Sequence, residues 1–242
     1  MSDTSNFRNN LLIKFEEIGL VEFKDYCVEL VTDMEKRSGQ EYNVLRGELA
    51  EVLLEALLRN LCSLFDKFGV RYQLIKNLAM IKRGSNGKLY SSEIDVCLCT
   101  EYRCYLFEVK SYKGKKTLTN ECLLHGFSDM DIYAQSKMHL DFFRECFDDS
   151  RLKFVEGRNG IPKPYKLVFF EFSSDGVEDL RDDEWKERIK MLNYKNFHKF
   201  FMEELSNKVV QWDLDKIKIN MDKLNNNRDM IMDYHLKRLS KR

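Results

Sequence analysis

The fold of this chain is decided by two short segments, which read Glu93-Ile94-Asp95-Val96 and Tyr105-Leu106-Phe107-Glu108-Val109-Lys110. Both are typical of β-strands, and each carries a carboxylate among apolar neighbours. The link Thr100-Glu101-Tyr102 between the strands is short, so it predicts an antiparallel hairpin. Side chains two residues apart on a strand share a face, which predicts Glu108 and Lys110 on one side of the sheet and Val109 on the other.

The hairpin is expected to bring Asp95 and Glu108 together at one end of the sheet. Two converging carboxylates repel each other unless a cation lies between them, and oxygen ligands of this kind suit Mg²⁺ or Mn²⁺. Lys110 would then orient or deprotonate a metal-bound water and stabilise charge on phosphorus. These residues predict phosphodiester hydrolysis, and they leave open an ordinary ion pair between Glu108 and Lys110 on a half-exposed sheet.

The sequence around the hairpin predicts further helices and strands in a regular order. Helical periodicity covers Phe7–Lys36, Tyr42–Phe68, Met130–Phe147, Asp182–Asn207 and Asp213–Lys241, whereas Val70–Lys82 and Tyr165–Phe172 are typical of strands. Gly69 is expected to end the second helix. This order predicts an α/β fold in which a mixed β-sheet is flanked by α-helices, with helical extensions at both ends of the chain.

One face of the second predicted helix carries Glu48, Glu51, Glu55 and Arg59, spaced by three, four and four residues. Such a face is either a solvated surface with ordinary helix pairs or a row of carboxylates that serves a site.

Composition narrows the possible environment. The 242 residues contain 40 Lys and Arg against 40 Asp and Glu, so net charge does not argue for a polyanionic partner. Positive charge is local, at Lys113, Lys115 and Lys116, which are expected either to contact DNA or to lie on a solvated loop. The seven cysteines form no regular framework, so Cys97, Cys99 and Cys104 are expected to be structural thiols in a reducing compartment. No apolar run is long enough to cross a bilayer, and we expect a cytoplasmic protein without a membrane partner.

At this point the sequence resembles a known family. Asp95 and the strand that ends in Glu108-Val109-Lys110 are similar to the signature of the PD-(D/E)XK nuclease superfamily, and the following Ser111-Tyr112-Lys113-Gly114 is similar to the nuclease-related domain called NERD. Upstream, Arg46-Gly47-Glu48-Leu49-Ala50-Glu51 resembles the helix-opening motif of that domain and of Holliday-junction resolvases, and Glu51 matches its metal-site Glu. Downstream, Tyr133-Ala134-Gln135 resembles the helix that presents a Gln to the same site.

The resemblance implies a restriction-endonuclease-like core at residues 42–175 of a single domain, with extensions at 1–41 and 176–242. It implies that the metal, Mg²⁺ or Mn²⁺, is held by Asp95, Glu108, the Val109 carbonyl and Glu51. Lys110 would assist the attacking water, and Gln135 would complete the site or remain a helix-surface residue. The implied substrate is DNA. RNA as the substrate, a catalytically silent binding or assembly module, and a homodimer or larger complex are the alternatives left open.

Overall fold

The computed structural model describes residues 2–37, 39–83, 89–100, 103–120, 123–125, 130–131 and 165–206. The chain folds into two compact units. The first unit comprises Met1–Gly69, Val109–Ile132 and Val168–Asn207, and the second comprises Val70–Glu108, Tyr133–Leu167 and Lys208–Arg242. The predicted division into a core at 42–175 and two extensions stays a prediction.

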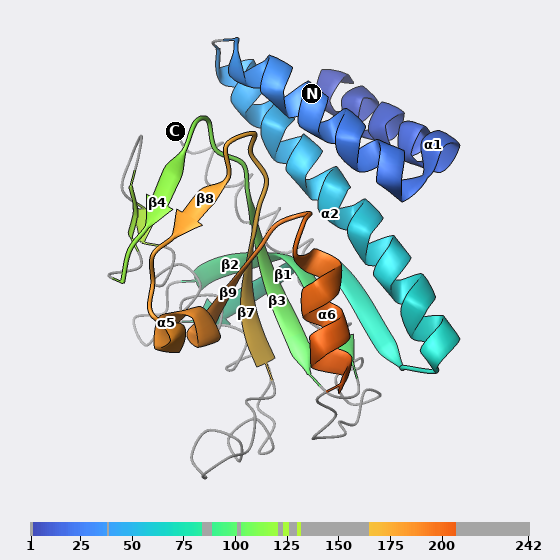
Figure 1. Cartoon of the computed structure of the whole chain (residues 1–242), viewed down its shortest axis with the longest axis vertical. Coiled ribbons are helices and arrows are strands. Elements are labelled where there is room, and N and C mark those ends of the chain that lie inside the picture. The colour runs from blue at the N-terminus through green and yellow to red at the C-terminus, as the bar shows by residue number, and fades with distance from the viewer. Residues whose placement is uncertain are drawn as a thin grey trace. The chain divides into compact units, whose positions relative to one another are not determined.

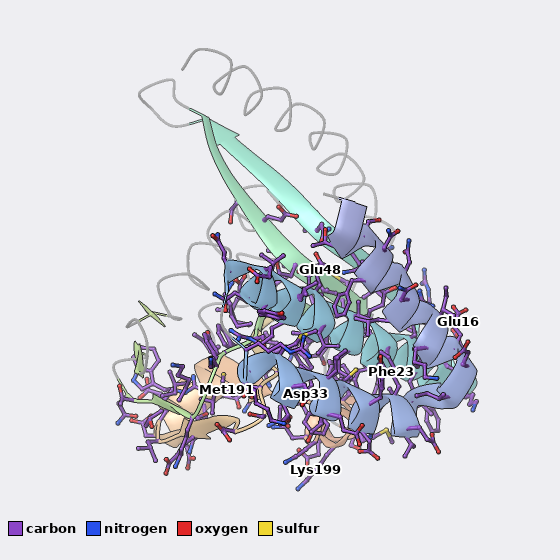
Figure 2. The ribbon with its side chains drawn as sticks, turned by 90° about the horizontal axis from the view of Figure 1, so that it is seen from above. Glu16, Phe23, Asp33, Glu48, Met191 and Lys199 are labelled. Carbon is purple, nitrogen blue, oxygen red and sulfur yellow. A yellow bond between two sulfur atoms is a disulfide. The ribbon has the colours of Figure 1, made fainter. Side chains whose placement is uncertain are left out.

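The first unit begins with two long helical elements, α1 (Ser2–Glu35) and α2 (Gln40–Phe68). Gly19, with φ 77° and ψ 174°, breaks α1 into two halves, because this backbone conformation is open to glycine and strained for other residues. Arg8 contacts Glu51 while Glu16 contacts Arg59, so the first half of α1 runs in the same direction as α2. Figure 1 shows α1 and α2 side by side, and Phe23, labelled in Figure 2, is fully buried.

The apolar stripe predicted for the second helix is buried as expected. It includes Leu49, Val52, Leu53, Ala56, Leu57 and Leu61, all without exposed surface. Gly69 ends α2 in the left-handed conformation, with φ 66° and ψ 25°, and its N–H donates to Asp66 O. The prediction that Gly69 terminates this helix is therefore confirmed.

The second unit is built around strands β1 (Tyr72–Arg83), β2 (Leu89–Thr100) and most of β3 (Cys104–Lys110). β1 pairs antiparallel with β2 from Tyr72↔Thr100 to Arg83↔Leu89. β2 pairs antiparallel with β3 from Cys99↔Cys104 to Val96↔Phe107, which confirms the predicted hairpin. These strands belong to a five-stranded sheet of order β1-β2-β3-β7-β9.

A second sheet was not predicted. Its order is β6-β5-β4-β8, formed by β4 (Lys116–Leu118), β5 (Leu123–His125), β6 (Met130–Asp131) and β8 (Val177–Asp179). β4 pairs in parallel with β8, so segments far apart in sequence lie side by side here. Met130–Asp131, predicted as the start of a helix, is a strand because it pairs with β5 at Leu123↔Asp131.

The strand predicted at Tyr165–Phe172 is present as β7 (Tyr165–Glu171). The single helix predicted over Asp182–Asn207 is wrong, because α5 (Asp183–Arg188) and α6 (Phe197–Ser206) are separated by β9 (Ile189–Leu192). Asp182 caps α5 by accepting a hydrogen bond from Trp185 N at 3.0 Å. Ile189 and Leu192 are buried in the strand, and pairing within the sheet outweighs the helical tendency of this segment.

The predicted mixed α/β class, with N-terminal helices ahead of a sheet, is confirmed. The helix predicted at Asp213–Lys241 and most of the one predicted at Met130–Phe147 lie outside the described residues. Among the helices that the structure describes, none has both the length and the apolar character needed to cross a membrane.

Candidate active site

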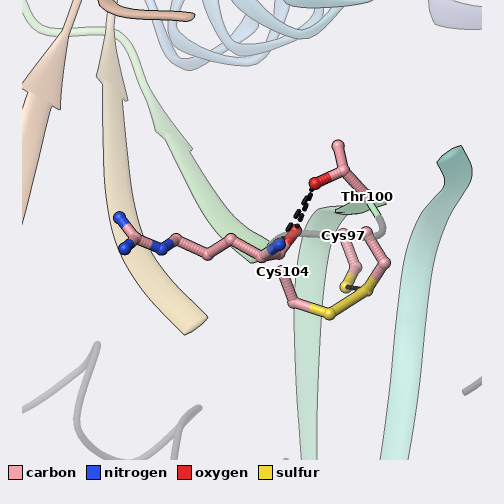
Figure 3. Close-up of a disulfide and its surroundings, with 5 residues drawn as sticks. Cys97, Thr100 and Cys104 are labelled. Carbon is pink, nitrogen blue, oxygen red and sulfur yellow. Dashed lines mark hydrogen bonds between the residues drawn. A yellow bond between two sulfur atoms is a disulfide. The ribbon is translucent and has the colours of Figure 1, made fainter. Parts of the chain in front are cut away.

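The β2–β3 hairpin is closed by a compact network at its turn. Thr100 N donates to Arg103 O at 2.9 Å, the Thr100 hydroxyl donates to the same carbonyl at 3.1 Å, and Arg103 N donates to Thr100 Oγ1 at 3.1 Å (Figure 3). A disulfide joins Cys99 to Cys104, the first cross-strand pair after the turn, with Cα atoms 4.0 Å apart. The turn therefore holds the two strands in one register.

This disulfide corrects the expectation that Cys99 and Cys104 are free thiols. Their register makes them direct cross-strand neighbours, whose side chains point to the same face. Cys97 remains a free buried thiol, with its Sγ 3.7 Å from Cys99 Sγ, and burial raises the pKa of the Cys97 thiol. Sequence spacing does not predict the Cys99–Cys104 disulfide, because the two cysteines become neighbours through the pairing of β2 with β3.

Asp95 and Glu108 lie at the other end of the same ladder. The paired register runs to Val96↔Phe107, and the next residues on the two strands are Asp95 and Glu108. Glu108 is 6 % exposed, whereas Asp95 is only half-buried. The convergence of the two carboxylates at one end of the sheet stays a prediction.

The end of β3 is held through its backbone. Phe172 N donates to Lys110 O at 3.0 Å, directly after the buried strand β7. Lys110 follows Glu108 by two residues, so strand alternation puts both side chains on one face, with the buried Val109 side chain on the other. Lys110 is half-buried. The predicted sharing of a face between an acid and an amine is thus compatible with the observed strand.

The donor set fits a hard divalent cation. Asp95, Glu108 and the Val109 carbonyl offer oxygen ligands only, which Mg²⁺ and Mn²⁺ prefer. Within the described residues no three His, Cys, Asp or Glu side chains cluster as a complete metal cage. Mg²⁺ does not require such a cage, because it retains several waters and commonly takes only one or two carboxylates beside substrate phosphates.

Glu51 lies on α2 in the first unit, 40 % exposed, and its Oε2 accepts a hydrogen bond from Arg8 Nη1 at 3.1 Å. Arg8 also contacts Glu48 and Glu55. Arg8 of α1 therefore pairs with three carboxylates of this α2 face, which α1 covers only in part, since Glu51 and Arg59 remain 40 % and 43 % exposed. Which of the two predicted readings of this face holds stays open.

The predicted nucleic-acid-binding lysines have different surroundings. Lys113 is exposed and its Nζ donates to the carbonyl of Arg37, two residues after α1, at 3.2 Å. Lys115 is exposed and pairs with Glu178 at 2.8 Å, a contact that raises the pKa of Lys115. Lys116 is 7 % exposed within β4. Gln135 lies outside the described residues.

With this geometry in place, comparison with known families is informative. The family profile described as "Nuclease-related domain" (NERD) matches residues 46–170, just over half of the chain. The chain belongs to the NERD family. The match begins within α2, at the Arg46 motif, and ends within β7, so it contains the β2–β3 hairpin with both carboxylates. Membership gives this chain a nuclease-related function.

Other comparisons add less to the NERD assignment. The chain is similar to a solved structure titled "Crystal Structure of Protein of Unknown Function AF1548", with 14 % identity and a TM-score of 0.27. That match covers 56 % of this chain and 55 % of the other, so the chain corresponds to about half of that protein. A comparison with curated proteins found no match.

The NERD chain also contains a buried acid that sequence reasoning missed. Glu171, at the end of β7, is 3 % exposed and accepts a hydrogen bond from the Ser173 hydroxyl. Burial raises the pKa of Glu171 to about 7; Glu35 adds to the rise, while Ser173 and Lys195 oppose it. Ser174, three residues after Glu171, donates from its backbone N to Glu35 Oε1 at 3.2 Å, and this contact joins the chain after β7 to α1. The sequence shows a Glu at the end of an apolar strand, but no neighbouring residue in the sequence indicates that this side chain is buried.

Proposed function

We propose that this chain is a metal-dependent endonuclease that hydrolyses DNA phosphodiester bonds. The observation that supports the proposal is the pair Asp95 and Glu108, which follow the last cross-strand pair of the β2–β3 ladder within the NERD match. Carboxylate oxygens on neighbouring strands are the ligands that a hard divalent cation such as Mg²⁺ or Mn²⁺ takes in proteins.

The proposed roles follow from the chemistry of each residue. Asp95, Glu108 and the Val109 carbonyl would hold Mg²⁺ or Mn²⁺, and Glu51 and Gln135 are assigned to the same site by family resemblance. When bound, the ion supplies a water of lowered pKa and neutralises charge on the phosphate. Lys110 would orient the attacking water and stabilise negative charge on the phosphate oxygens.

The phosphate backbone needs positive charge beside the site. Lys113 and Lys115 follow the end of β3 closely and are exposed. We assign these two lysines to contacts with the DNA backbone, which carry affinity without reading sequence, and leave out Lys116 because it is 7 % exposed within β4. Cleavage of both strands of a duplex would require two copies of the site, and therefore a dimer. A DNA substrate inside the cell makes the cytoplasm the proposed place of action.

The test is cleavage by the purified full chain. Supercoiled plasmid, linear duplex and single-stranded RNA are incubated with wild type, Asp95→Asn, Glu108→Gln and Lys110→Met, in Mg²⁺ and in EDTA. The matched control is Glu93→Gln, which removes an exposed carboxylate from the same strand as Asp95. We expect Mg²⁺-dependent DNA cleavage in wild type and Glu93→Gln, and only background cleavage in the other three variants.

Three outcomes would contradict the proposal in different ways. Cleavage that persists in Asp95→Asn excludes the mechanism. Cleavage of RNA but not DNA would make RNA the substrate in place of DNA, because metal-assisted hydrolysis does not by itself distinguish a 2′-hydroxyl. DNA binding without cleavage, and without Mn²⁺ binding in calorimetry, identifies a catalytically silent module.

A further inference from the structure

The connection between α1 and α2 lies beside the chain that follows β3. Lys113 Nζ donates to the carbonyl of Arg37 at 3.2 Å across 76 residues of sequence, and both residues belong to the first unit. Arg37 stands two residues after the end of α1 and three before the start of α2. It also lies outside residues 46–170, which match the NERD family. The contact therefore sets a residue from outside the family match directly beside a lysine that is assigned to DNA.

The Arg37 side chain is exposed and is held over an aromatic ring. Its guanidinium carbon lies 5.6 Å from the centre of the Tyr42 ring, in the first turn of α2. The Tyr42 side chain is half-buried, so the ring gives the guanidinium a fixed support. A group that is ordered before binding loses less conformational freedom when it meets its partner. Arg37 is thus prepared to bind an anion.

Arg37 and Lys113 carry charge that no ion pair offsets. Neither side chain forms an ion pair with any residue that the structure describes, and Lys113 donates to a neutral carbonyl. Lys36, the residue before Arg37, is different, because it pairs with Asp33 at 2.9 Å. Two exposed and adjacent cations without carboxylate partners are available to an anion from solution.

Two acids flank Arg37 in the sequence, and both are engaged elsewhere. Glu35 accepts hydrogen bonds from the backbone N and the hydroxyl of Ser174. A Cβ added to Gly39 would collide with the Glu41 carboxylate, so this carboxylate lies against the start of α2. The positive end of the helix dipole stabilises an acid in that position. Neither acid therefore neutralises Arg37.

A buried cation adds positive charge to the same end of α2. Arg46 lies one turn beyond Tyr42 and is 5 % exposed. Its Nη2 donates to Asn43 Oδ1 at 2.9 Å, whereas its Nε has no hydrogen-bond partner among the described residues. Arg46 is too buried to touch DNA, but its charge raises the electrostatic potential around the first turns of α2.

We propose that Arg37 contacts the DNA backbone beside Lys113, so that the DNA-binding surface continues from the chain after β3 onto the α1–α2 connection. This inference rests on the proposed function, in which Lys113 binds DNA. A phosphodiester group fits Arg37 because a guanidinium can donate to two phosphate oxygens at once. Such a contact positions the DNA and reads no base.

The experiment measures binding of a short fluorescent DNA duplex to the full chain over a range of salt concentrations, in EDTA so that no cleavage occurs. Arg37→Ala should reduce the slope of log binding constant against log salt by about 0.9, the value for one phosphate contact. For each fourfold rise in salt, wild type should then lose about 3-fold more affinity than the variant. Arg37→Lys should keep the slope, because counterion release depends on charge. The Lys113 contact survives these substitutions, since Lys113 bonds the backbone carbonyl of residue 37.

The matched control is Lys36→Ala, which removes the same charge from the neighbouring residue. Lys36 is exposed and paired with Asp33, so this variant should keep the wild-type slope. The double variant Arg37→Ala with Lys113→Ala should lower the slope by about twice as much as either single variant. Thermal melts of each variant verify that it is folded, and Arg37→Gln carries the test if Arg37→Ala is not.

The outcomes distinguish this inference from the proposed function. An unchanged slope in Arg37→Ala overturns the inference whatever Lys113→Ala does, and DNA cleavage that depends on Asp95 then leaves the proposed function in place. Equal reductions in Arg37→Ala and Lys36→Ala also overturn it, because the effect would come from net charge alone. Wild type that neither binds nor cleaves DNA overturns the proposed function together with the inference.

Discussion

Replacing Glu171 with Gln should stabilise the protein at alkaline pH and leave it nearly unchanged at acidic pH. Glu171 is 3 % exposed, and burial raises its pKa from the ordinary value of 4.5 to about 7. The folded state therefore binds a proton at this carboxyl more tightly than the unfolded chain does. The stability contributed by the protonated acid is fully present below about pH 4.5 and is lost as the pH rises through about 7.

The magnitude follows from the same values. The difference between about 7 and 4.5, at about 1.36 kcal/mol per pKa unit, amounts to about 3 kcal/mol at pH 8. At pH 5 the corresponding cost is only about 1 kcal/mol, because most of the carboxyl is still protonated in the folded state. Gln keeps an acceptor for the Ser173 hydroxyl and carries no charge. Glu171→Gln should therefore gain about 2 kcal/mol over wild type between pH 5 and pH 8.

The assay is urea unfolding of wild type and Glu171→Gln at several pH values from 5 to 8, with the difference in free energy of unfolding plotted against pH. Other titrating groups cancel in this difference. The control is Glu178→Gln, which changes an exposed carboxylate of the same unit and should give a flat line. A flat line for Glu171→Gln as well would refute the reasoning, because Glu171 would then ionise as it does in the unfolded chain.

Three further predictions concern other contacts. Asp179→Ala should lower the free energy of unfolding by about 3–5 kcal/mol, because it leaves the fully buried Arg181 guanidinium without its carboxylate partner. The double variant Asp179→Leu with Arg181→Met should recover much of this loss, and urea unfolding measures both effects. When the logarithm of the DNA-binding constant is plotted against the logarithm of salt concentration, Lys113→Ala should reduce the slope by about 1. The control is Lys14→Ala, in α1, which should leave the slope unchanged. An unchanged slope for Lys113→Ala as well would remove Lys113 from the DNA interface. Cys104→Ala should destabilise the protein by about 2 kcal/mol through loss of a short covalent loop, and a non-reduced peptide map of wild type that lacks a Cys99–Cys104 linkage would contradict it.

The pKa of Asp179 illustrates why the buried pair matters. Burial alone would raise the pKa of this carboxyl, but hydrogen bonds and charge from Arg181 outweigh burial and hold the pKa below its ordinary value. Arg181 Nε and Nη2 donate to the two Asp179 oxygens, each at 2.9 Å. The pair is therefore stable as a unit and costly to break on one side.

The sequence by itself determined the elements whose signals are local. The short link after Thr100 predicted the β2–β3 hairpin, and the antiparallel pairing of the two strands confirms it. The apolar stripe of α2 and the glycine that ends it were also readable, because burial on one face repeats every turn and a left-handed residue favours glycine. The family signature falls on the same local stretch, which is why it was recognisable before the fold was known.

Tertiary structure alone decided the contacts that join distant segments. Arg8 meets Glu51 across 43 residues, and the strand pair β4–β8 joins segments whose sequences carry no sign of each other. Cys99 and Cys104 are bonded because of strand register, and Glu171 holds its proton because of burial. A periodic pattern states which face of an element is apolar. It does not state which partner covers that face, because partner choice depends on the packing free energy of the whole fold.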